Sequence, residues 1–451
     1  MRRHVLALVF AALAAAPVLA QAPAQAQAPR IVIVHAGQLL DRPGRPARGA
    51  STVVIRDGRI VEVRDGHVAA AAAGYTGAEV VDLRDRYVLP GLVDSHVHLT
   101  SDTGGVLSQL EEVQLNPAAK AYNALANAHK TLGAGFTTVR NLGDRDGVTL
   151  ALRDAIRAGK VVGPNIVDAG TSISTTSGHM DPALGFRDDL REALDRHDNL
   201  CDGADACRRA VRLQVARGVD VIKIATTGGV NSRIGAGLSQ QMFEDEARAI
   251  VDTARLYGKK VAVHAHGVDG VKVALAAGVD SIEHGTTLDD ESLELFRKSG
   301  AYYVPTLSTV NGYLERIAAD PNAYAPAVRA KVDWRIRITG ESLRKAVPRG
   351  VKIAFGTDAG VSKHGRNGEE FALMVKHGMT PAQALEAATV NAADLLGLSA
   401  EVGTLEPGKR ADLIAVEGDP LRDVTVLERV PFVMKDGAVF KDERTVATAA
   451  R

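Results

Sequence analysis

The sequence predicts an α/β protein, a (β/α)8 TIM-like barrel with a small composite β-sandwich domain built from both chain ends. The middle of the chain repeats a short apolar, β-branched run followed by a helical pattern, which is typical of parallel strands covered by helices. Both ends show short alternating runs separated by Asp-Gly turns, which favours antiparallel strands. The composition is globular, with 46% hydrophobic and 24% charged residues.

The first residues have the features of an export signal. Residues 1–4 are basic, residues 5–16 form an apolar run that is too short to span a bilayer comfortably, and small residues end at Ala20. We expect a signal peptide over residues 1–20 and a flexible Ala/Gln/Pro-rich lead-in over residues 21–30. The expected location is therefore the periplasm or the medium, and a membrane anchor is the alternative.

The charge balance narrows the possible partners. The chain has 54 Lys and Arg against 54 Asp and Glu, so it lacks the basic excess that binding to a phosphate backbone needs. We therefore expect no nucleic-acid partner. Beyond the signal, no stretch reaches about 18 uncharged apolar residues, so we expect no stable membrane insertion.

The two β-rich ends are predicted to pair into one domain. Its first part is residues 31–90 and its second part is residues 401–441, followed by a C-terminal tail over residues 442–451. The expected strands are Ile31–Ala36, Ser51–Arg56, Gly58–Arg64, Glu79–Leu83, Asp412–Glu417, Val430–Lys435 and Ala438–Lys441.

Residues 91–400 are predicted to form the barrel. A doubly wound open sheet is the alternative, but no G-x-G-x-x-G follows the first strand to support it. The eight expected strands are Gly91–Val97, Phe136–Asn141, Asn165–Gly170, Val219–Ala225, Lys260–His264, Asp280–His284, Tyr302–Thr306 and Val351–Gly356.

The two cysteines lie close together in a polar stretch. Cys201 and Cys207 can close a small loop by a disulfide in an oxidising compartment, and two free thiols are the alternative. A zinc site made from these two residues alone is implausible, since a structural site usually has four ligands.

Polar side chains stand where the apolar barrel strands end, which is the face that carries the active site in barrel enzymes. His96 and His98 are two residues apart and so point to the same side of their strand. Lys223 interrupts an apolar strand, although lysines are almost never fully buried without a partner. Taken singly, such residues can be packed histidines, a salt-bridged lysine or a helix-capping aspartate. Together they predict a metal centre made of His96, His98, Lys223, His264, His284 and Asp358.

This donor set predicts two divalent metal ions, zinc or a similar borderline ion. A protonated lysine cannot bind a cation, but a carbon dioxide-derived carbamate on Lys223 would be an anion able to bridge two ions. The ions would activate a water molecule and polarise the scissile carbonyl, while Asp358 would act as general base and then as general acid. The assignment is His96, His98 and Asp358 to one ion, and His264 and His284 to the other.

Several segments carry a resemblance to a known family: Leu89-Pro90-Gly91-Leu92-Val93-Asp94-Ser95-His96-Val97-His98, the strand around Lys223, residues 263–267 (VHAHG), residues 281–285 (SIEHG), and residues 356–358 (GTD). They resemble the amidohydrolase superfamily, and more narrowly its imidazolonepropionase-like branch. That branch contains binuclear Xaa-Pro and Xaa-Arg dipeptidases (carboxypeptidases) and ochratoxin-hydrolysing amidases. The resemblance covers about residues 31–441, and it implies the barrel, the composite β-sandwich and a homo-oligomer of up to eight subunits.

The same resemblance implies two further functional residues. His266, two residues beyond the fifth-strand histidine, would support the substrate carbonyl or tetrahedral oxygen, and His179 in the loop after the third strand would touch the substrate. Arg140 and Arg233 are candidates for binding a substrate carboxylate, with a surface charge as the alternative for each. The chain departs from relatives at Asn141, where they often carry Asp, so a role for that position is in doubt.

The leading functional hypothesis is a metal-dependent amide hydrolase that releases the C-terminal amino acid of a dipeptide or an N-acyl amino acid. Ochratoxin A, which would give ochratoxin alpha and phenylalanine, has this type of bond. An imidazolonepropionase-like cyclic amide hydrolase is one alternative, against which Lys223 argues because such enzymes use one metal and lack this lysine. A non-catalytic barrel is the other alternative, and the presence of every ligand position argues against it.

Overall fold

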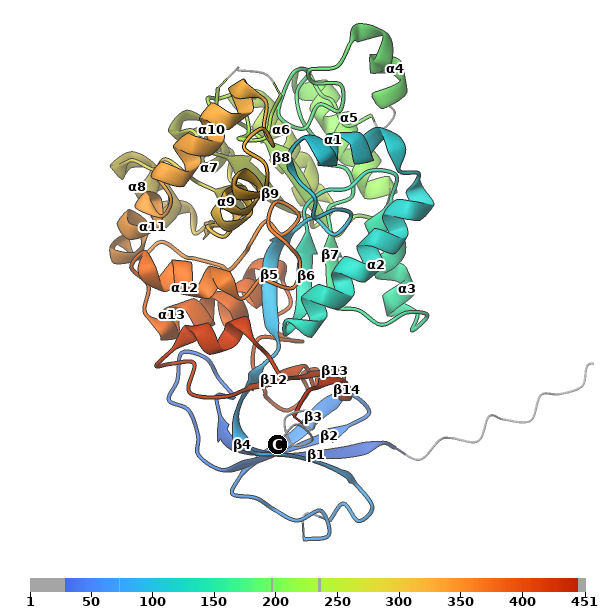
Figure 1. Ribbon diagram of the computed structural model, residues 1–451, viewed down its shortest axis with the longest axis vertical. Coiled ribbons are helices and arrows are strands. Elements are labelled where there is room, and N and C mark those ends of the chain that lie inside the picture. The colour runs from blue at the N-terminus through green and yellow to red at the C-terminus, as the bar shows by residue number, and fades with distance from the viewer. Residues whose placement is uncertain (1–28, 73, 196–197, 234–236, 445–451) are drawn as a thin grey trace, which may run out of the picture.

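The computed structural model describes residues 29–72, 74–195, 198–233 and 237–444 (Figure 1). The expected signal peptide, most of the lead-in and the end of the C-terminal tail lie outside these residues. In the part of the chain that is described, no helix is long and apolar enough to cross a membrane.

Both chain ends contribute to a single seven-stranded sheet, which confirms the composite β-domain. Its centre is β4, which is parallel to β1 and antiparallel to β12, with Leu413 opposite Pro90 and Val416 opposite Tyr87. Figure 1 shows this sheet below the barrel. The strand order is β14(Ala438–Asp442), β13(Phe432–Lys435), β12(Leu413–Val416), β4(Glu79–Pro90), β1(Ile31–Leu39), β2(Ser51–Arg56) and β3(Arg59–Asp65).

The barrel strands form two parallel sheets that hydrogen bonds join at both seams. At one seam, the amide of Ile173 donates to the carbonyl of Lys223 over 2.8 Å. At the other, the segment 351–356 lies between the sheets: Ser95 N donates to Phe355 O over 2.9 Å, and Tyr303 N donates to Lys352 O over 2.8 Å. The sheets are β5(Leu92–Val97), β6(Phe136–Asn141) and β7(Asn165–Asp168), then β8(Val221–Ala225), β9(Lys260–Ala265), β10(Ser281–His284) and β11(Tyr302–Val304).

The eighth expected barrel strand differs from the prediction. Segment 351–356 is not a regular strand and makes one β-bridge, between Ile353 and Tyr303. The amide of Phe355 donates to the carbonyl of Ala387, at 3.0 Å, instead of joining a strand ladder. The segment therefore occupies the place of the eighth strand without its regular pairing.

Helices cover the barrel strands on the outside (Figure 1), which explains why those strands are apolar on both faces. Local sequence sets their ends: Asn116 caps α2 by accepting from Ala119 N over 2.9 Å, and Pro117 occupies the first turn. The helices are α1(Gly105–Gln114), α2(Pro117–Gly133), α3(Val148–Arg157), α4(Arg191–Leu194), α5(Ala204–Ala216), α6(Glu244–Leu256), α7(Val268–Ala277), α8(Asp290–Ser299), α9(Thr309–Ala319), α10(Pro326–Arg337), α11(Glu341–Ala346), α12(Glu369–Lys376), α13(Pro381–Glu386) and α14(Ala392–Leu396).

Cys201 and Cys207 are joined by a disulfide, as expected. Cys207 belongs to the first turn of α5 and Cys201 to the loop before it, and both are buried. Cys201 N also donates to Ser174 O over 2.8 Å, so the bridge fixes α5 to the loop that follows β7.

Phe432 tests whether the two chain ends share one core. It is fully buried in a cluster that also contains apolar residues of β1, β2 and β4. We expect Phe432→Ala to destabilise the domain by about 3–5 kcal/mol and to speed hydrogen–deuterium exchange in β1 and β4 as well as in β12–β14. Val439→Ala, on the exposed side of β14, is the matched control. Faster exchange confined to β12–β14 would contradict a shared core.

Candidate active site

The six candidate metal ligands lie at the C-terminal ends of barrel strands. Two of them have left-handed backbone, which residues other than glycine rarely adopt: His284 (φ +69°) and Asp358 (φ +57°). Such residues cost about 1–3 kcal/mol each and are often found at functional sites. Asp358 N donates to His96 O over 2.8 Å, which ties its turn to β5. The positions are His96 in β5, His98 beyond it, Lys223 in β8, His264 in β9, His284 at the end of β10 and Asp358 after segment 351–356.

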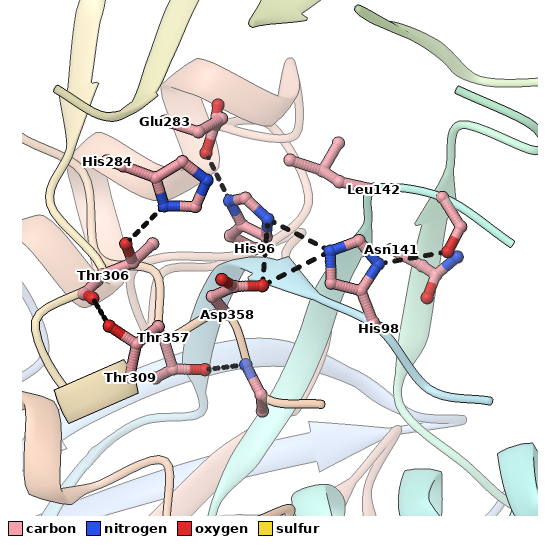
Figure 2. A network of polar contacts seen from close by, with 12 residues as sticks. His96, His98, Asn141, Leu142, Glu283, His284, Thr306, Thr309, Thr357 and Asp358 are labelled. Atoms are coloured by element: carbon pink, nitrogen blue, oxygen red, sulfur yellow. Dashed lines mark hydrogen bonds and ion pairs between the residues drawn. The ribbon is translucent and has the colours of Figure 1, made fainter. Parts of the chain in front are cut away.

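Three of these side chains bring their ligand atoms to nearly equal distances (Figure 2). His96 Nε2 lies 3.3 Å from His98 Nε2, and Asp358 Oδ1 lies 3.4 Å from His96 Nε2 and 3.3 Å from His98 Nε2. Ligand atoms about 2.0–2.1 Å from a tetrahedral zinc ion are about 3.3–3.4 Å from one another. The three atoms therefore fit one ion, which agrees with the grouping that the sequence suggests.

A second histidine cluster lies beside the first. One ligand atom each of His264, His266 and His284 lies within 4.8 Å of the others, and the same holds for His96, His284 and Asp358. His284 therefore stands between the two groups. The structure brings the expected pair His264 and His284 together and adds His266 next to them.

Hydrogen bonds orient the rings toward the cavity. The Nδ1 atom of His96 lies 2.9 Å from Glu283 Oε2, that of His98 lies 3.1 Å from the Gly143 carbonyl, and that of His284 lies 2.8 Å from Thr306 Oγ1. Figure 2 shows the contacts of His96 and His284. Each partner leaves Nε2 free to bind a metal, as in many metal sites. Burial lowers the pKa of His96 to about 4 and that of His284 well below its ordinary value, so both are neutral at pH 7.

Lys223 carries a buried amine with a lowered pKa, which is the condition for forming a carbamate. Its side chain is 1% exposed, and its Nζ has no hydrogen-bond partner among the described residues. Burial lowers the pKa of the amine to about 8, although the carboxylates of Glu283 and Asp358 oppose this shift. A partly deprotonated amine can react with carbon dioxide. The imidazole and carboxylate groups of the same cavity include clusters that could hold a divalent metal ion.

Arg140 does not lie where a substrate carboxylate could reach it, and this corrects the expectation. The side chain is buried: Nε donates to Ser95 O over 2.6 Å and Nη2 donates to Glu283 Oε1 over 2.7 Å. Burial would raise the pKa of Glu283, but Arg140 and His96 lower it to about 2. Arg140 therefore holds Glu283 as the anion that accepts from His96.

His179 and His266 both contact candidate metal ligands. His179 stacks on His264, with ring centroids 4.1 Å apart, and its Nδ1 lies 2.7 Å from Ser232 Oγ. A side chain at Gly229 would clash with the His179 ring, because an added Cβ would lie 2.1 Å from it. His266 stacks on His284, and its Nδ1 lies 2.7 Å from Thr286 Oγ1. Both histidines line the cavity that contains the ligands.

Two cavities meet at this point. The inner cavity, about 220 Å³, contains the ligand cluster, and the outer cavity, about 370 Å³, opens beside it. Arg233 lines the outer cavity, with its guanidinium 3.5 Å from the ring centroid of Phe186. The side chains that line both cavities are His98, His179, Met180, Asn231 and Val361.

Sequence reasoning missed several residues of the site. The sequence could have indicated Glu283, because a carboxylate inside an apolar strand needs a partner, just as Lys223 does. Tyr313 of α9, Asn231 and Arg335 of α10 also line the inner cavity. The helical residues had no signal, since they lie outside the strand ends.

Residues 87–440 match the amidohydrolase family. The chain belongs to this family. An ochratoxinase from Aspergillus niger is 33% identical over 428 residues, which cover 91% of this chain and 87% of that protein. A crystal structure of a Xaa-Pro dipeptidase with methionine bound in its active site has a TM-score of 0.85 and 40% identity, and the match covers 91% of this chain and 100% of that one. An imidazolonepropionase from Symbiobacterium thermophilum is 27% identical, over 85% of this chain and 90% of that protein. The protein is therefore a hydrolase of the branch that the motifs resemble.

Glu283 tests how this amidohydrolase orients a candidate ligand. Glu283→Gln keeps an acceptor near His96 but removes the charge beside Arg140, so we expect zinc affinity to fall about 10- to 100-fold in a competition titration with a chelating dye. Glu246→Gln is the control, because Glu246 is also buried but accepts from Gly203 N and Phe243 N beside α6. Equal zinc affinity in both variants would contradict the role of Glu283.

Proposed function

We propose that the protein is a binuclear metal-dependent amidohydrolase that cleaves the amide bond to the C-terminal amino acid of a dipeptide or an N-acyl amino acid. The observation that carries this proposal is the orphaned amine of Lys223 beside imidazole and carboxylate donors at zinc-like spacing. Ochratoxin A, an acylated phenylalanine, is a specific candidate substrate. The similarity to an ochratoxinase and to a Xaa-Pro dipeptidase supports this substrate class.

The side chains of the site have separate roles in this proposal. Bound metal ions would supply an activated water molecule and Lewis-acid polarisation of the carbonyl. The first ion would be held by His96, His98 and Asp358, the second by His264 and His284, and the carbamate of Lys223 would be shared.

Asp358 and His266 act on the substrate itself. Asp358 Oδ accepts the proton of the attacking water and returns it to the leaving amine, acting first as base and then as acid. Its position on a constrained turn beside His96 and His98 suits this exchange. In this proposal the Thr286 hydroxyl donates to His266 Nδ1, which places the ring hydrogen on Nε2, where it can donate to the carbonyl oxygen. This donor stabilises the charge that develops on that oxygen.

A cyclic amide hydrolase similar to imidazolonepropionase is the weaker alternative. The similarity to an imidazolonepropionase supports it. A cyclic amide hydrolase of this kind has no role for the buried Lys223 amine, whereas the binuclear proposal makes that amine the site of a shared carbamate ligand.

The location and assembly of the protein are part of the proposal. We propose export to the periplasm or the medium, on the pattern of residues 1–20, and a homo-oligomer of up to eight subunits, on the family resemblance. The disulfide between Cys201 and Cys207 supports an oxidising compartment.

A substrate panel combined with metal analysis tests the function. Protein loaded with zinc and bicarbonate is incubated with dipeptides, N-acyl amino acids and ochratoxin A, and the released amino acid is measured. We expect hydrolysis, two ions per chain and complete loss of activity on chelation. One ion per chain with release from cyclic amides would favour the alternative, and no bound ion would contradict a metal-dependent hydrolase.

His266→Ala separates catalysis from metal binding. We expect kcat to fall about 100- to 1,000-fold while the metal content stays full, because a donor to the developing oxyanion is lost. Steady-state kinetics with the best substrate of the panel and metal analysis of the same sample provide the measurement. Retained activity would remove His266 from the mechanism, and loss of metal would make it a ligand instead.

A further inference from the structure

We propose that Arg335, assisted by Tyr313, binds the free carboxylate of the substrate's C-terminal amino acid in the inner cavity. This inference rests on the proposed function, because it assumes that the leaving group is an amino acid. It assigns a recognition role to a helix that the sequence analysis did not connect with the site.

Arg335 is a buried cation that the described structure leaves without an anion. It lies in α10, is 3% exposed and contacts only neutral oxygens. Nη2 donates to the carbonyls of Pro305 and Thr306, each over 3.3 Å, and Nη1 donates to Thr339 Oγ1 over 3.3 Å. No carboxylate of the described residues lies within 4.0 Å of its guanidinium nitrogens. An unpaired buried charge is costly, so its presence in a ligand cavity points to an anionic ligand.

Arg335 also lies close to the groups that are proposed to act on the scissile amide. It lines the inner cavity together with His266, His284 and Asp358. The neighbouring Trp334 lies edge-on to His266, with ring centroids 6.3 Å apart. An anion at Arg335 would therefore lie beside the groups proposed to act on the scissile amide.

The helix that carries Arg335 is held against the site. One turn earlier, Lys331 donates to the carbonyls of Gly229 and Ser232, over 3.0 and 2.7 Å. Residues four apart lie on the same helix face, so the contacts of Lys331 hold the face that carries Arg335. The guanidinium is therefore positioned before a substrate arrives.

Tyr313 of α9 offers a second donor to the inner cavity. Its ring is 3% exposed, and its hydroxyl accepts from Asn231 Nδ2 over 3.4 Å. Within the described residues, that hydroxyl has no acceptor for its own hydrogen. A guanidinium and a phenol facing one cavity are a suitable donor set for a carboxylate.

Arg140 and Arg233 are less suited than Arg335 to bind the substrate carboxylate. Arg140 is already paired with Glu283 and lies outside both cavities. Arg233 lines only the outer cavity and stacks on Phe186. Arg335 is the one of the three that lines the inner cavity, where His96, His264, His284 and Asp358 lie.

The experiment compares a substrate with its own C-terminal amide. The probe pair is an N-acyl amino acid that the wild type hydrolyses and the same compound with its carboxylate converted to a carboxamide. We expect the wild type to prefer the free acid, and Arg335→Met to lower kcat/KM for the acid roughly 10- to 100-fold, mainly through KM, while changing the amide by less than about threefold. Tyr313→Phe should produce a smaller loss in the same direction.

Arg337→Met is the matched control, because Arg337 lies on the same helix but is exposed. Metal content and thermal unfolding confirm that each variant is folded and loaded. If Arg335→Met does not fold, Arg335→Lys replaces it, and the expected result is a loss of acid-over-amide preference. Equal losses for acid and amide, or a wild type without preference, would overturn this inference alone. Failure to hydrolyse any acylated amino acid would overturn the proposed function.

Discussion

The burial of the Lys223 amine is the constraint on which the site depends. The side chain lies inside the barrel, and its Nζ has no hydrogen-bond partner among the described residues. The neighbouring buried carboxylate of Glu283 is already engaged, because it accepts from Arg140, Ser281 and His96. An unpaired ammonium there would cost several kcal/mol. Burial therefore favours the neutral amine and lowers the pKa of Lys223 to about 8, well below that of an ordinary lysine.

A second buried carboxylate explains how the irregular eighth segment still places Asp358 accurately. Asp94 Oδ1 accepts from the amides of His96 and Thr357, each over 3.1 Å. Its Oδ2 accepts from Thr357 Oγ1 over 2.6 Å and from Asn367 Nδ2 over 2.8 Å. These side-chain bonds replace a missing strand ladder. They fix the turn that carries Asp358 to the strand that carries His96, so one carboxylate positions two candidate metal ligands.

The parts of the structure that the sequence predicts well are those where burial leaves a local pattern. Strands covered on both faces must be apolar along their length, so the sequence predicts Phe136–Asn141 with its observed bounds and the other regular barrel strands within two residues at every end. Parallel strands also place their C-terminal ends together, so residues such as His96 and Asp358 could be grouped without knowing any distance.

Long-range pairing leaves no such pattern. Arg140 looked available because its partner Glu283 lies 143 residues further along the chain. The apolar character of the eighth segment predicts a strand, but one of its amides bonds to Ala387, which the local sequence does not reveal. Arg335 lies on a helix of mixed polarity, and only the folded arrangement brings it to the inner cavity.

The two connected cavities suggest how a substrate lies in the site. With the carboxylate at Arg335, the leaving amino acid would occupy the inner cavity, and the acyl group would extend past His98 and His179, which line both cavities, into the larger outer one. Most charges of the outer wall are already engaged: Arg145 pairs with Glu112, and Arg316 donates to the carbonyls of Thr103 and Val361. Selection of the acyl group would then depend mainly on shape and on stacking near Arg233 and Phe186, whereas selection of the amino acid would depend on charge. Under the proposed function, this division would allow acyl groups of different structure to be accepted while the free carboxylate is still preferred.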